Sequence, residues 1–253
     1  MNYTKAEVLE TLEQTMRTLK LSGLAKEWRT VEYHDNEQYM RELLEIEVRE
    51  REANRMARMI KQANFRVLKT LDNFVWKSGI EIPQTISREE IETASFVNNK
   101  ENLVLMGAVG TGKTHLATAI ALNLCQQGRR VRFFTATGLA NILQEKHQRG
   151  LLTNFMNSLR KVELLVLDEI GFITLHKEAA ELLFQVVSDC YEQKSLIITS
   201  NLEFSQWNTV FGNDKLTAAM IDRLIHHSHI LVFSGPGHRL EESLKRQKAG
   251  KKK

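Results

Sequence analysis

One eight-residue segment constrains the fold of this chain more than any other part of its sequence. Gly107–Thr114 reads Gly-Ala-Val-Gly-Thr-Gly-Lys-Thr and fits the pattern G-x-x-x-x-G-K-S/T. It follows the apolar run Asn102–Met106 and precedes a predicted helix at Lys113–Gln127, which is the context in which this pattern cradles phosphates. A strand that enters a helix through such a loop predicts a parallel sheet flanked by helices.

The residue types in this loop match what a nucleoside triphosphate needs. The glycines let the backbone fold around the phosphates, so that N–H groups and the amino-terminal end of the next helix face the anion. Lys113 supplies a positive charge to the β- and γ-phosphates, and Thr114 offers its hydroxyl to Mg²⁺. The predicted site for ATP and Mg²⁺ therefore consists of Gly107, Ala108, Val109, Gly110, Thr111, Gly112, Lys113 and Thr114.

A second apolar run ends in two adjacent acids. Leu164–Leu167 is typical of a buried strand, and Asp168 and Glu169 follow it directly. At the carboxyl end of such a strand Asp168 can hold Mg²⁺, as a Walker B aspartate does, and Glu169 can polarise the attacking water as a general base. The alternative, that two acids merely begin a loop, is weak in a chain that carries a P-loop. The pair predicts an enzyme that hydrolyses ATP.

Two further residues are candidates for the same site. The run Leu196–Thr199 leads to Asn201, and strand ends line the ligand crevice of an open sheet; Asn201 can therefore bond the γ-phosphate or the water, or it is simply an asparagine in a turn. Arg223 lies in the predicted helix Lys215–His227, at a domain edge from which an arginine can reach a neighbouring subunit's γ-phosphate. From the residues alone, a surface pair with Asp222 is preferred.

Short apolar runs alternate with helical segments in the second part of the chain, which predicts an α/β fold with a parallel five-stranded sheet. Residues 1–64 contain no proline and have apolar residues at helical spacing, which predicts a small all-helical region. The expected strands are Asn102–Met106, Val131–Phe134, Glu163–Leu167, Leu196–Thr199 and His229–Phe233. The expected amino-terminal helices are about Lys5–Leu21, Leu24–Glu32 and Glu37–Ala63, with Thr4 and Glu7 as a capping box.

The basic character of the chain comes from its carboxyl-terminal end. Residues 1–238 carry 28 Lys and Arg against 29 Asp and Glu, whereas residues 239–253 carry 7 against 2. The run Lys245–Lys253 is expected to be a solvated, disordered end that adds salt-dependent attraction to phosphates. Net charge alone therefore does not establish DNA binding.

Hydropathy argues against a membrane protein. No apolar run approaches the roughly 18–20 residues that a bilayer requires, and the charged amino-terminal segment has no apolar signal core. We therefore expect a cytoplasmic protein without membrane contacts. Cys125 and Cys190 lie in apolar helical patterns, which favours buried, reduced thiols.

Three arginines of the third predicted helix have two interpretations. Arg51, Arg55 and Arg58 fall on one stripe of that helix. They either pair with neighbouring Glu and Asn side chains on an exposed face or form a ridge that contacts DNA phosphates. The two interpretations are about equally favoured.

Taken together, four motifs resemble the IstB family, the AAA+ helper ATPases of insertion-sequence transposons, which are related to the DnaC helicase loaders. The motifs are Gly-x-x-Gly-Thr-Gly-Lys-Thr-His-Leu-Ala, Leu-Leu-Val-Leu-Asp-Glu-Ile-Gly, Ile-Thr-Ser-Asn and Ile-Asp-Arg-Leu-Ile-His. The likeness covers nearly the whole chain. Its amino-terminal matches, which include Leu19–Ala25, Leu43–Glu47 and Lys69–Phe74, favour IstB over DnaC.

The resemblance implies a role for each matching residue. Arg223 matches the arginine-finger position, which reverses the preference for a surface pair and implies a homo-oligomer with shared ATP sites. Thirty residues follow Arg223, too few for a full helical lid. The other implied roles are Lys113 and Thr114 for the nucleotide, Thr114 and Asp168 for Mg²⁺, Glu169 for the water, Asn201 as sensor 1, His115 and Arg239 as further nucleotide contacts with Arg239 at sensor 2, and Phe74–Trp76 beside the adenine.

The resemblance also indicates where DNA is contacted. Relatives of the initiator type place extra helical structure against DNA, and the corresponding segment here is about Gly138–Lys161. Its basic residues are Lys146, Arg149, Arg160 and Lys161. The candidate DNA-binding residues are Lys146 and Arg149 together with Arg51, Arg55 and Arg58.

The resulting prediction divides the chain into three parts. They are a helical domain at residues 1–68 for self-assembly and for DNA or partner contacts, an AAA+ ATPase domain without a full lid at 69–238, and a basic tail at 239–253. By resemblance, ATP drives assembly on duplex DNA with little regard to sequence, the assembly recruits or activates a partner transposase, and hydrolysis resets it.

Two other functions are weighed against this one. A replicative helicase loader like DnaC acts on single-stranded DNA, and for that task Gly138–Lys161 offers only Phe155 as an aromatic ring on which bases stack. A non-catalytic adaptor gated by nucleotide is the second alternative. The intact pair Asp168 and Glu169 argues against it.

Overall fold

The computed structural model describes residues 4–235 and 237. The chain forms two compact units, Met1–Arg58 and Met59–Lys253. The division falls within one long helix, α3 (Asn36–Ala63), earlier in the chain than the boundary expected after residue 68. Each unit is described separately below.

The described part of the first unit is helical. Its elements are α1 (Lys5–Thr18), α2 (Ser22–Glu27), a 3-10 turn (Trp28–Thr30) and the greater part of α3. The predicted capping box is confirmed, because the Glu7 N–H donates to Thr4 Oγ1 and the Thr4 N–H donates to Glu7 Oε2. These two bonds satisfy backbone donors that the first helical turn leaves free.

Glu47 fastens α2 to α3 within this unit. Its buried carboxylate accepts hydrogen bonds from the N–H groups of Gly23 and Leu24, at 2.9 and 3.2 Å, and from Arg51 Nε at 2.8 Å. Burial by itself raises the pKa of Glu47, but these donors outweigh burial and the pKa is lowered. Glycine is required at position 23 because a Cβ there would lie 2.5 Å from Glu50 Cβ.

The second unit is built on a six-stranded sheet in the order β1-β6-β2-β5-β4-β3. The five predicted strands are confirmed and run parallel: β2 (Asn102–Gly107), β3 (Val131–Thr135), β4 (Leu164–Ile170), β5 (Ser195–Ser200) and β6 (Ser228–Phe233). The sixth strand, β1 (Ile80–Glu81), is outside the predicted set and pairs antiparallel with β6 at the sheet edge. Two residues are too few to leave a periodic pattern in a sequence.

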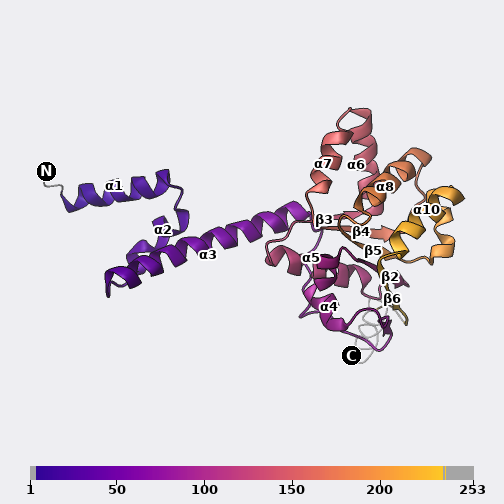
Figure 1. Ribbon diagram of the computed structural model, residues 1–253, viewed down its shortest axis with the longest axis horizontal. Helices are drawn as coiled ribbons and strands as arrows, with labels where there is room; N and C mark the ends of the chain where they lie inside the picture. The colour runs from indigo at the N-terminus through magenta and orange to yellow at the C-terminus, as the bar shows by residue number, and fades with distance from the viewer. Residues whose placement is uncertain (1–3, 236, 238–253) are drawn as a thin grey trace, which may run out of the picture. The chain divides into compact units, whose positions relative to one another are not determined.

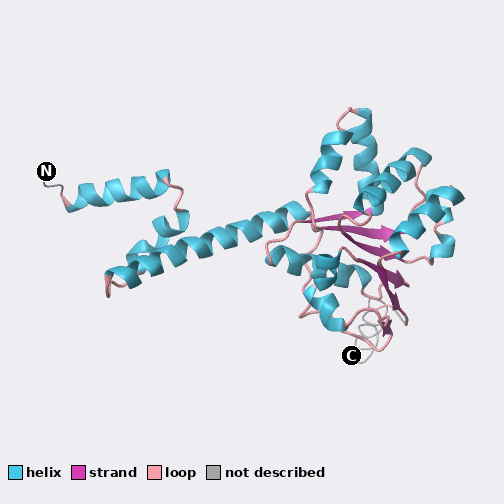
Figure 2. Ribbon diagram, viewed as in Figure 1, coloured by secondary structure: helices cyan, strands magenta, loops and turns pink. Residues whose placement is uncertain are grey.

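Helices cover both faces of this sheet, as Figure 1 and Figure 2 show. One face carries α4 (Arg88–Thr93) and α5 (Lys113–Gln126). The other carries α6 (Ala136–Gln148), α7 (Leu152–Arg160), α8 (Lys177–Cys190), α9 (Asn208–Phe211) and α10 (Asp214–Ile225). The six-stranded sheet thus forms the middle of three layers, as the predicted α/β fold requires.

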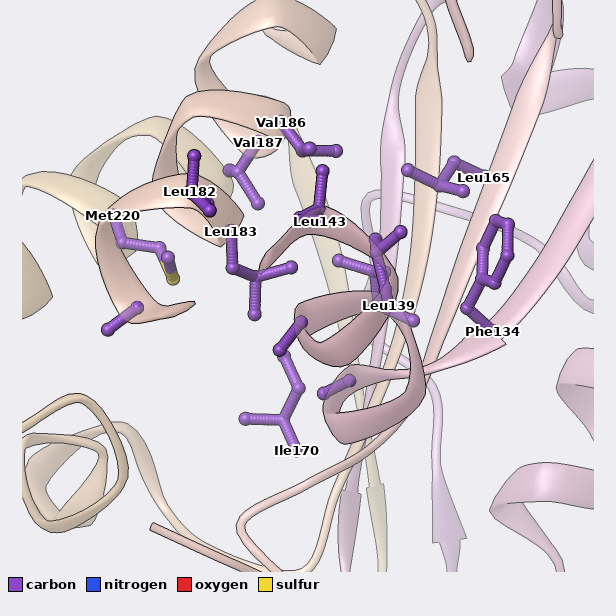
Figure 3. Packing of buried hydrophobic residues seen from close by; sticks show 14 of the residues in the cluster. Phe134, Leu139, Leu143, Leu165, Ile170, Leu182, Leu183, Val186, Val187 and Met220 are labelled. Carbon is purple, nitrogen blue, oxygen red and sulfur yellow. The ribbon is translucent and has the colours of Figure 1, made fainter. Parts of the chain in front are cut away.

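Successive side chains of a strand point to opposite faces of the sheet, so each buried strand contributes to the core on both faces. In β4, Leu164 and Val166 pack on the α5 side, whereas Leu165 and Leu167 pack on the α6 and α8 side. Figure 3 shows Leu165 close to side chains of α6 and α8. A strand buried on both faces reads as a continuous apolar run, which is why β4 is visible in the sequence.

The carboxyl ends of the parallel strands bring polar residues to one edge of the sheet. Gly107 ends β2, Thr135 ends β3, and Asp168 and Glu169 lie near the end of β4. Register places Thr135 beside Asp168, and β5 lies between β2 and β4. The P-loop and the acidic pair therefore meet at this edge.

Two further sequence expectations concern membrane-spanning helices and the state of the two cysteines. No described helix is long and apolar enough to cross a membrane. Cys125 and Cys190 are free and buried, and burial raises the pKa of each thiol to about 12. Thiols in this condition are unreactive core side chains.

Candidate nucleotide-binding and hydrolysis site

The P-loop runs from the end of β2 to the first turn of α5, and two glycines set its path. Gly107 has a φ of 140°, and a Cβ on it would lie 2.2 Å from the carbonyl oxygen of Phe233. Gly112 has a φ of 108° and caps the amino-terminal end of α5. Both backbone conformations favour glycine strongly. Together with the amino-terminal end of α5, the loop amides form a site for an anion.

Lys113 lies in the first turn of α5 with its side chain buried. Its Nζ donates to the carbonyl oxygens of Gly107 and Ala108, at 2.6 and 2.7 Å. Burial lowers the pKa of Lys113, and the Asp168 carboxylate partly opposes that shift. Neutral carbonyl groups are weaker partners for an ammonium than charged phosphate oxygens are, so a bound triphosphate is the stronger partner for this side chain.

Two threonine hydroxyls converge on Asp168. Thr114 Oγ1 and Thr199 Oγ1 both donate to Asp168 Oδ1, at 2.9 and 2.6 Å. The oxygen of Thr199 also accepts the N–H of Glu169 at 2.9 Å. Because Asp168 is buried, these side chains rather than bulk water fix its carboxylate. The network joins the P-loop, β4 and β5 into one site.

Thr199 is a residue of this site that the sequence motifs do not assign. Threonine is common in strands, so a hydroxyl at the end of an apolar run attracts no attention by itself. The available signal is its place two residues before Asn201. Its proximity to the acids depends on β5 pairing with β4, where Leu167 lies opposite Ile198, and this strand order is not written in the sequence.

The backbone at Glu169 is unusual for a residue with a side chain. Its φ of 63° lies in the left-handed region, which costs a non-glycine residue about 1–2 kcal/mol. The β4–β5 register shifts at this point, between Leu167 and Ile170, and such irregularities re-aim side chains beside active sites. The side chain of Glu169 is 40% exposed and lines the same pocket as Lys113 and Thr114. It can therefore reach a water molecule.

Asn201 follows β5 at the same edge. Its buried Oδ1 has no hydrogen-bond partner among the described residues. A Cβ on Gly171, in the loop after β4, would lie 2.7 Å from this oxygen. A buried amide oxygen without a partner calls for an explanation, and a ligand or water at this edge would supply one.

Lys113, Thr114, Asp168 and Glu169 line one pocket of about 640 Å³, a size typical of small-molecule sites. Thr199 and Asn201 lie outside the lining of this pocket. Its second wall is residues 66–77, which we call the rim segment; it contributes Arg66, Val67, Lys69, Asn73, Phe74, Val75 and Lys77. His115 ties this segment to α5, because its Nε2 lies 3.1 Å from the carbonyl oxygen of Thr70 and its ring packs edge-on against Phe74. The sequence motifs assign the P-loop wall but not Arg66 or Lys69.

The rim segment gives the pocket an apolar end. Phe74 and Val75 line the pocket, and a Cβ on Gly112 would lie 3.4 Å from the Phe74 ring. Trp76 packs edge-on against Phe74, and its indole N–H donates to Glu92 Oε1 at 2.7 Å. An aromatic wall next to a phosphate loop is suited to a nucleobase.

The donor set of the pocket fits ATP and Mg²⁺. Thr114 Oγ1 and Asp168 Oδ1 are hard oxygen ligands of the kind that Mg²⁺ takes, and they lie 2.9 Å apart. Three lysines of the lining give the cavity positive charge that suits a triphosphate: Lys69, Lys77 and Lys113. Arg66 also lines the cavity, beside Glu169.

Arg223 lies outside the lining of this pocket, just before β6. Because β6 begins opposite the start of β2, Arg223 lies toward the edge of the sheet opposite the P-loop. The six residues of β2 span roughly 20 Å between the two edges, farther than an arginine side chain extends. Its Nη1 donates to the Ala219 carbonyl at 3.0 Å, and its guanidinium lies 4.9 Å from the Phe184 ring centroid. Neither contact involves Asp222.

Two predictions concern residues that the structure does not describe. Arg239 and the run Lys245–Lys253 lie outside the described residues. The last described residue, Gly237, abuts the P-loop, because a Cβ on it would lie 2.7 Å from the Val109 carbonyl oxygen.

The candidate DNA contacts lie on α3 and at the end of α6. Arg149 pairs with Glu145 at 3.1 Å, and Lys146 is partly exposed. Arg51 pairs with Glu47 at 2.8 Å, in agreement with the paired-face interpretation of that residue. The three candidate arginines of α3 are all exposed: Arg51, Arg55 and Arg58.

Comparison with known sequences agrees with the resemblance to the IstB family. The sequence profile of the IstB-like ATP binding protein family matches residues 14–246. A candidate ATP-binding protein of insertion sequence IS5376 from Geobacillus stearothermophilus is 34% identical over 239 residues, 92% of this chain and 95% of that protein. Its counterpart from insertion sequence IS21 of Pseudomonas aeruginosa is 36% identical over 190 residues, 75% of this chain and 71% of that protein.

Comparison with solved structures concerns the fold. The DnaC helicase loader has a TM-score of 0.51 and 24% identity, covering 65% of this chain and 96% of that one. AMPPCP-bound DnaA from Aquifex aeolicus has a TM-score of 0.53 and 24% identity, covering 70% of this chain and 55% of that one. The predicted α/β fold is therefore confirmed, and these proteins share it.

Proposed function

This chain belongs to the family of IstB-like ATP-binding proteins, and we propose that it is an ATPase that assembles on duplex DNA to serve an insertion-sequence transposase. One observation carries the ATPase. The hydroxyls of Thr114 and Thr199 fix Asp168, and Thr199 also holds the backbone of Glu169 beside the P-loop. Asp168, Glu169 and the P-loop thus line one pocket. The partner transposase is proposed because the relatives are proteins of insertion sequences.

The proposed reaction transfers the γ-phosphoryl group of ATP to water. The P-loop amides and Lys113 hold the phosphates, and Thr114 with Asp168 would hold Mg²⁺, which when bound neutralises charge on the phosphate oxygens. Glu169 takes a proton from the water as the water oxygen bonds to the γ-phosphorus. The bond from that phosphorus to the β–γ bridging oxygen breaks, and ADP leaves with its electron pair. Asn201, which follows β5, is the proposed partner of the water or of the γ-phosphate.

We propose that each ATP site is shared by two subunits. Arg223 lies toward the edge of the sheet opposite its own P-loop, so a role of its guanidinium in hydrolysis requires the nucleotide of another copy. The rim segment and the P-loop also expose apolar side chains at Val67, Leu68, Val75 and Val109. Apolar groups gathered at a pocket mark a contact surface, and a neighbouring subunit is the partner that a trans arginine requires.

The proposed DNA contacts go to phosphates. Lys146, Arg149, Arg55 and Arg58 are candidate contacts on exposed or partly exposed helix surface, and Lys245–Lys253 adds charge. Contacts of this kind fix a protein on the duplex without reading its sequence. Assembly on duplex DNA of any sequence would follow.

A helicase loader is the alternative on the same fold. Single strands are commonly held by bases stacked on aromatic rings. Phe155, the aromatic residue of the Gly138–Lys161 segment, instead packs against the core, with its ring centroid 6.4 Å from that of Phe134. This core contact weakens the case for Phe155 as a ring on which bases stack, and with it the case for a helicase loader.

Affinity for duplex DNA is expected to fall steeply with salt and to vary little with sequence. For six or more phosphate contacts, the loss is on the order of 10³-fold between about 50 and 200 mM salt. Fluorescence anisotropy of the full chain with an unhydrolysable ATP analogue measures this, using unrelated duplexes and a single strand of equal length.

Removing Lys245–Lys253 is expected to weaken this binding and flatten the salt slope, while ATP turnover without DNA stays unchanged. An unchanged slope would show that the tail takes no part in binding. Tighter binding of the single strand than of the duplex would favour the helicase loader.

A further inference from the structure

Arg66 lies beside the residues that are proposed to hydrolyse ATP, and no motif accounts for it. It is the first residue of the rim segment and comes shortly after the end of α3. Its Nη1 is 3.9 Å from Glu169 Oε2, and its Nη2 donates to Thr135 Oγ1 at 3.4 Å. Thr135 pairs in register with Asp168. One guanidinium therefore bridges the ends of β3 and β4 next to the proposed base.

The backbone that carries Arg66 is fastened to β3. Asn64, with a φ of 65°, turns the chain out of α3. Phe65 packs on Phe133 with ring centroids 5.8 Å apart. The carbonyl oxygen of Gln62 accepts a hydrogen bond from Arg132 Nη1 at 2.6 Å. Contacts with β3 on both sides of Asn64 thus set the point from which Arg66 reaches Glu169.

Stability does not explain an arginine at this position. The side chains of Arg66 and Glu169 are 70% and 40% exposed, and exposed ion pairs contribute little to folding because water screens them. Thr135 does not depend on Arg66 either, since its Oγ1 already accepts the Gly138 N–H at 3.1 Å as the cap of α6. The contact is better understood through the chemistry of Glu169.

We propose that Arg66 is a positioning residue that orients the Glu169 carboxylate toward the attacking water. This inference rests on the proposed ATPase function. With Nη1 next to Oε2 and Nη2 held by Thr135, the carboxylate presents Oε1 to take the proton. Arginine suits the task because its planar fork contacts two partners at once and its charge does not titrate near neutral pH. Lysine would keep the charge but lose the fork.

Arg66→Ala in the full chain is expected to lower kcat roughly 10- to 100-fold, because displacing a reacting group by about 1 Å has effects of that size. The KM for ATP and the affinity for an ATP analogue should stay near wild type, since the P-loop is untouched. Arg66→Lys should restore part of kcat. Arg66→Gln, which keeps the aliphatic part of the side chain and removes the guanidinium, gives the same comparison if the alanine variant is unstable.

The matched control is Lys61→Ala. It removes an exposed positive charge from the last turn of α3, outside the pocket, and should keep the wild-type kcat. A fall in kcat equal to that of Arg66→Ala would mean that general electrostatics, and not the contact with Glu169, controls the rate, and would overturn the proposal.

A double variant tests whether Arg66 acts through Glu169. Adding Arg66→Ala to Glu169→Gln should not lower the residual rate further, because residues that act as a unit are not additive. A further loss in the double variant, or an unchanged or raised kcat in Arg66→Ala, would overturn the positioning role. Failure of the proposed ATPase looks different: wild type would release no phosphate, or Glu169→Gln would turn over normally.

Discussion

Glu169→Gln is expected to bind ATP normally and hydrolyse it very slowly. The amide keeps the size of the carboxylate but cannot take a proton from the water. General-base catalysis contributes about 10²–10⁴-fold, so kcat should fall by that order. ATP affinity should stay near wild type because Lys113 and Thr114 are unchanged. Phosphate release and binding of a fluorescent ATP analogue measure the two quantities, and the trapped protein should accumulate on DNA as an ATP-bound oligomer.

Glu203→Gln is the matched control for this experiment. Glu203 is an exposed glutamate shortly after β5, outside the lining of the pocket, and its amide variant should turn over like wild type. Wild-type turnover by Glu169→Gln would remove Glu169 as the base. Loss of ATP binding by Glu169→Gln would instead assign Glu169 a role in forming the site.

Arg223→Ala is expected to keep nucleotide binding and lose turnover. Lys113 and Thr114 belong to the same chain as the P-loop, so binding does not need the neighbour. The charge that develops on the γ-phosphoryl group would lack its trans donor, and such arginines are worth on the order of 10³–10⁵ in rate. Wild-type turnover per subunit should also rise with protein concentration, because a shared site needs two subunits. Phosphate release over a dilution series measures this.

Mixing two inactive variants tests the sharing directly. Arg223→Ala retains its P-loop and Lys113→Ala retains its arginine, so a mixed interface can restore one complete site and some activity. Lys215→Ala, an exposed change at the other end of α10, should behave as wild type. Nearly normal hydrolysis by Arg223→Ala alone, or no recovery on mixing, would contradict a trans arginine.

The sequence predicts those parts of the site in which only a few residue types can do the required chemistry. Gly107 and Gly112 have positive φ values, and a loop that must adopt them beside phosphates leaves a readable pattern. Asp168 and Glu169 lie near the end of a strand buried on both faces, directly after its apolar run, and that run makes them recognisable. The bounds of helices and strands differ by a few residues from expectation because element ends fray.

The rest of the site depends on tertiary structure. Thr199 donates its hydrogen bond to Asp168 only because β5 pairs with β4. Arg66 reaches Glu169 only because the end of α3 packs on β3. Threonine at a strand end and arginine on an exposed segment are both ordinary, so neither stands out before the fold is known. A partner for Arg223 cannot be seen in a single chain.

The steady-state rate of ATP hydrolysis tests the proposed function most directly. It is measured for the full chain alone, with single-stranded DNA and with duplex DNA of the same length. We predict turnover that requires Mg²⁺, saturates with ATP and rises most with the duplex, because subunits gathered on DNA complete one another's sites. Phosphate release no greater than that of Lys113→Ala under all three conditions would contradict the ATPase. Stimulation by the single strand alone would contradict assembly on duplex DNA.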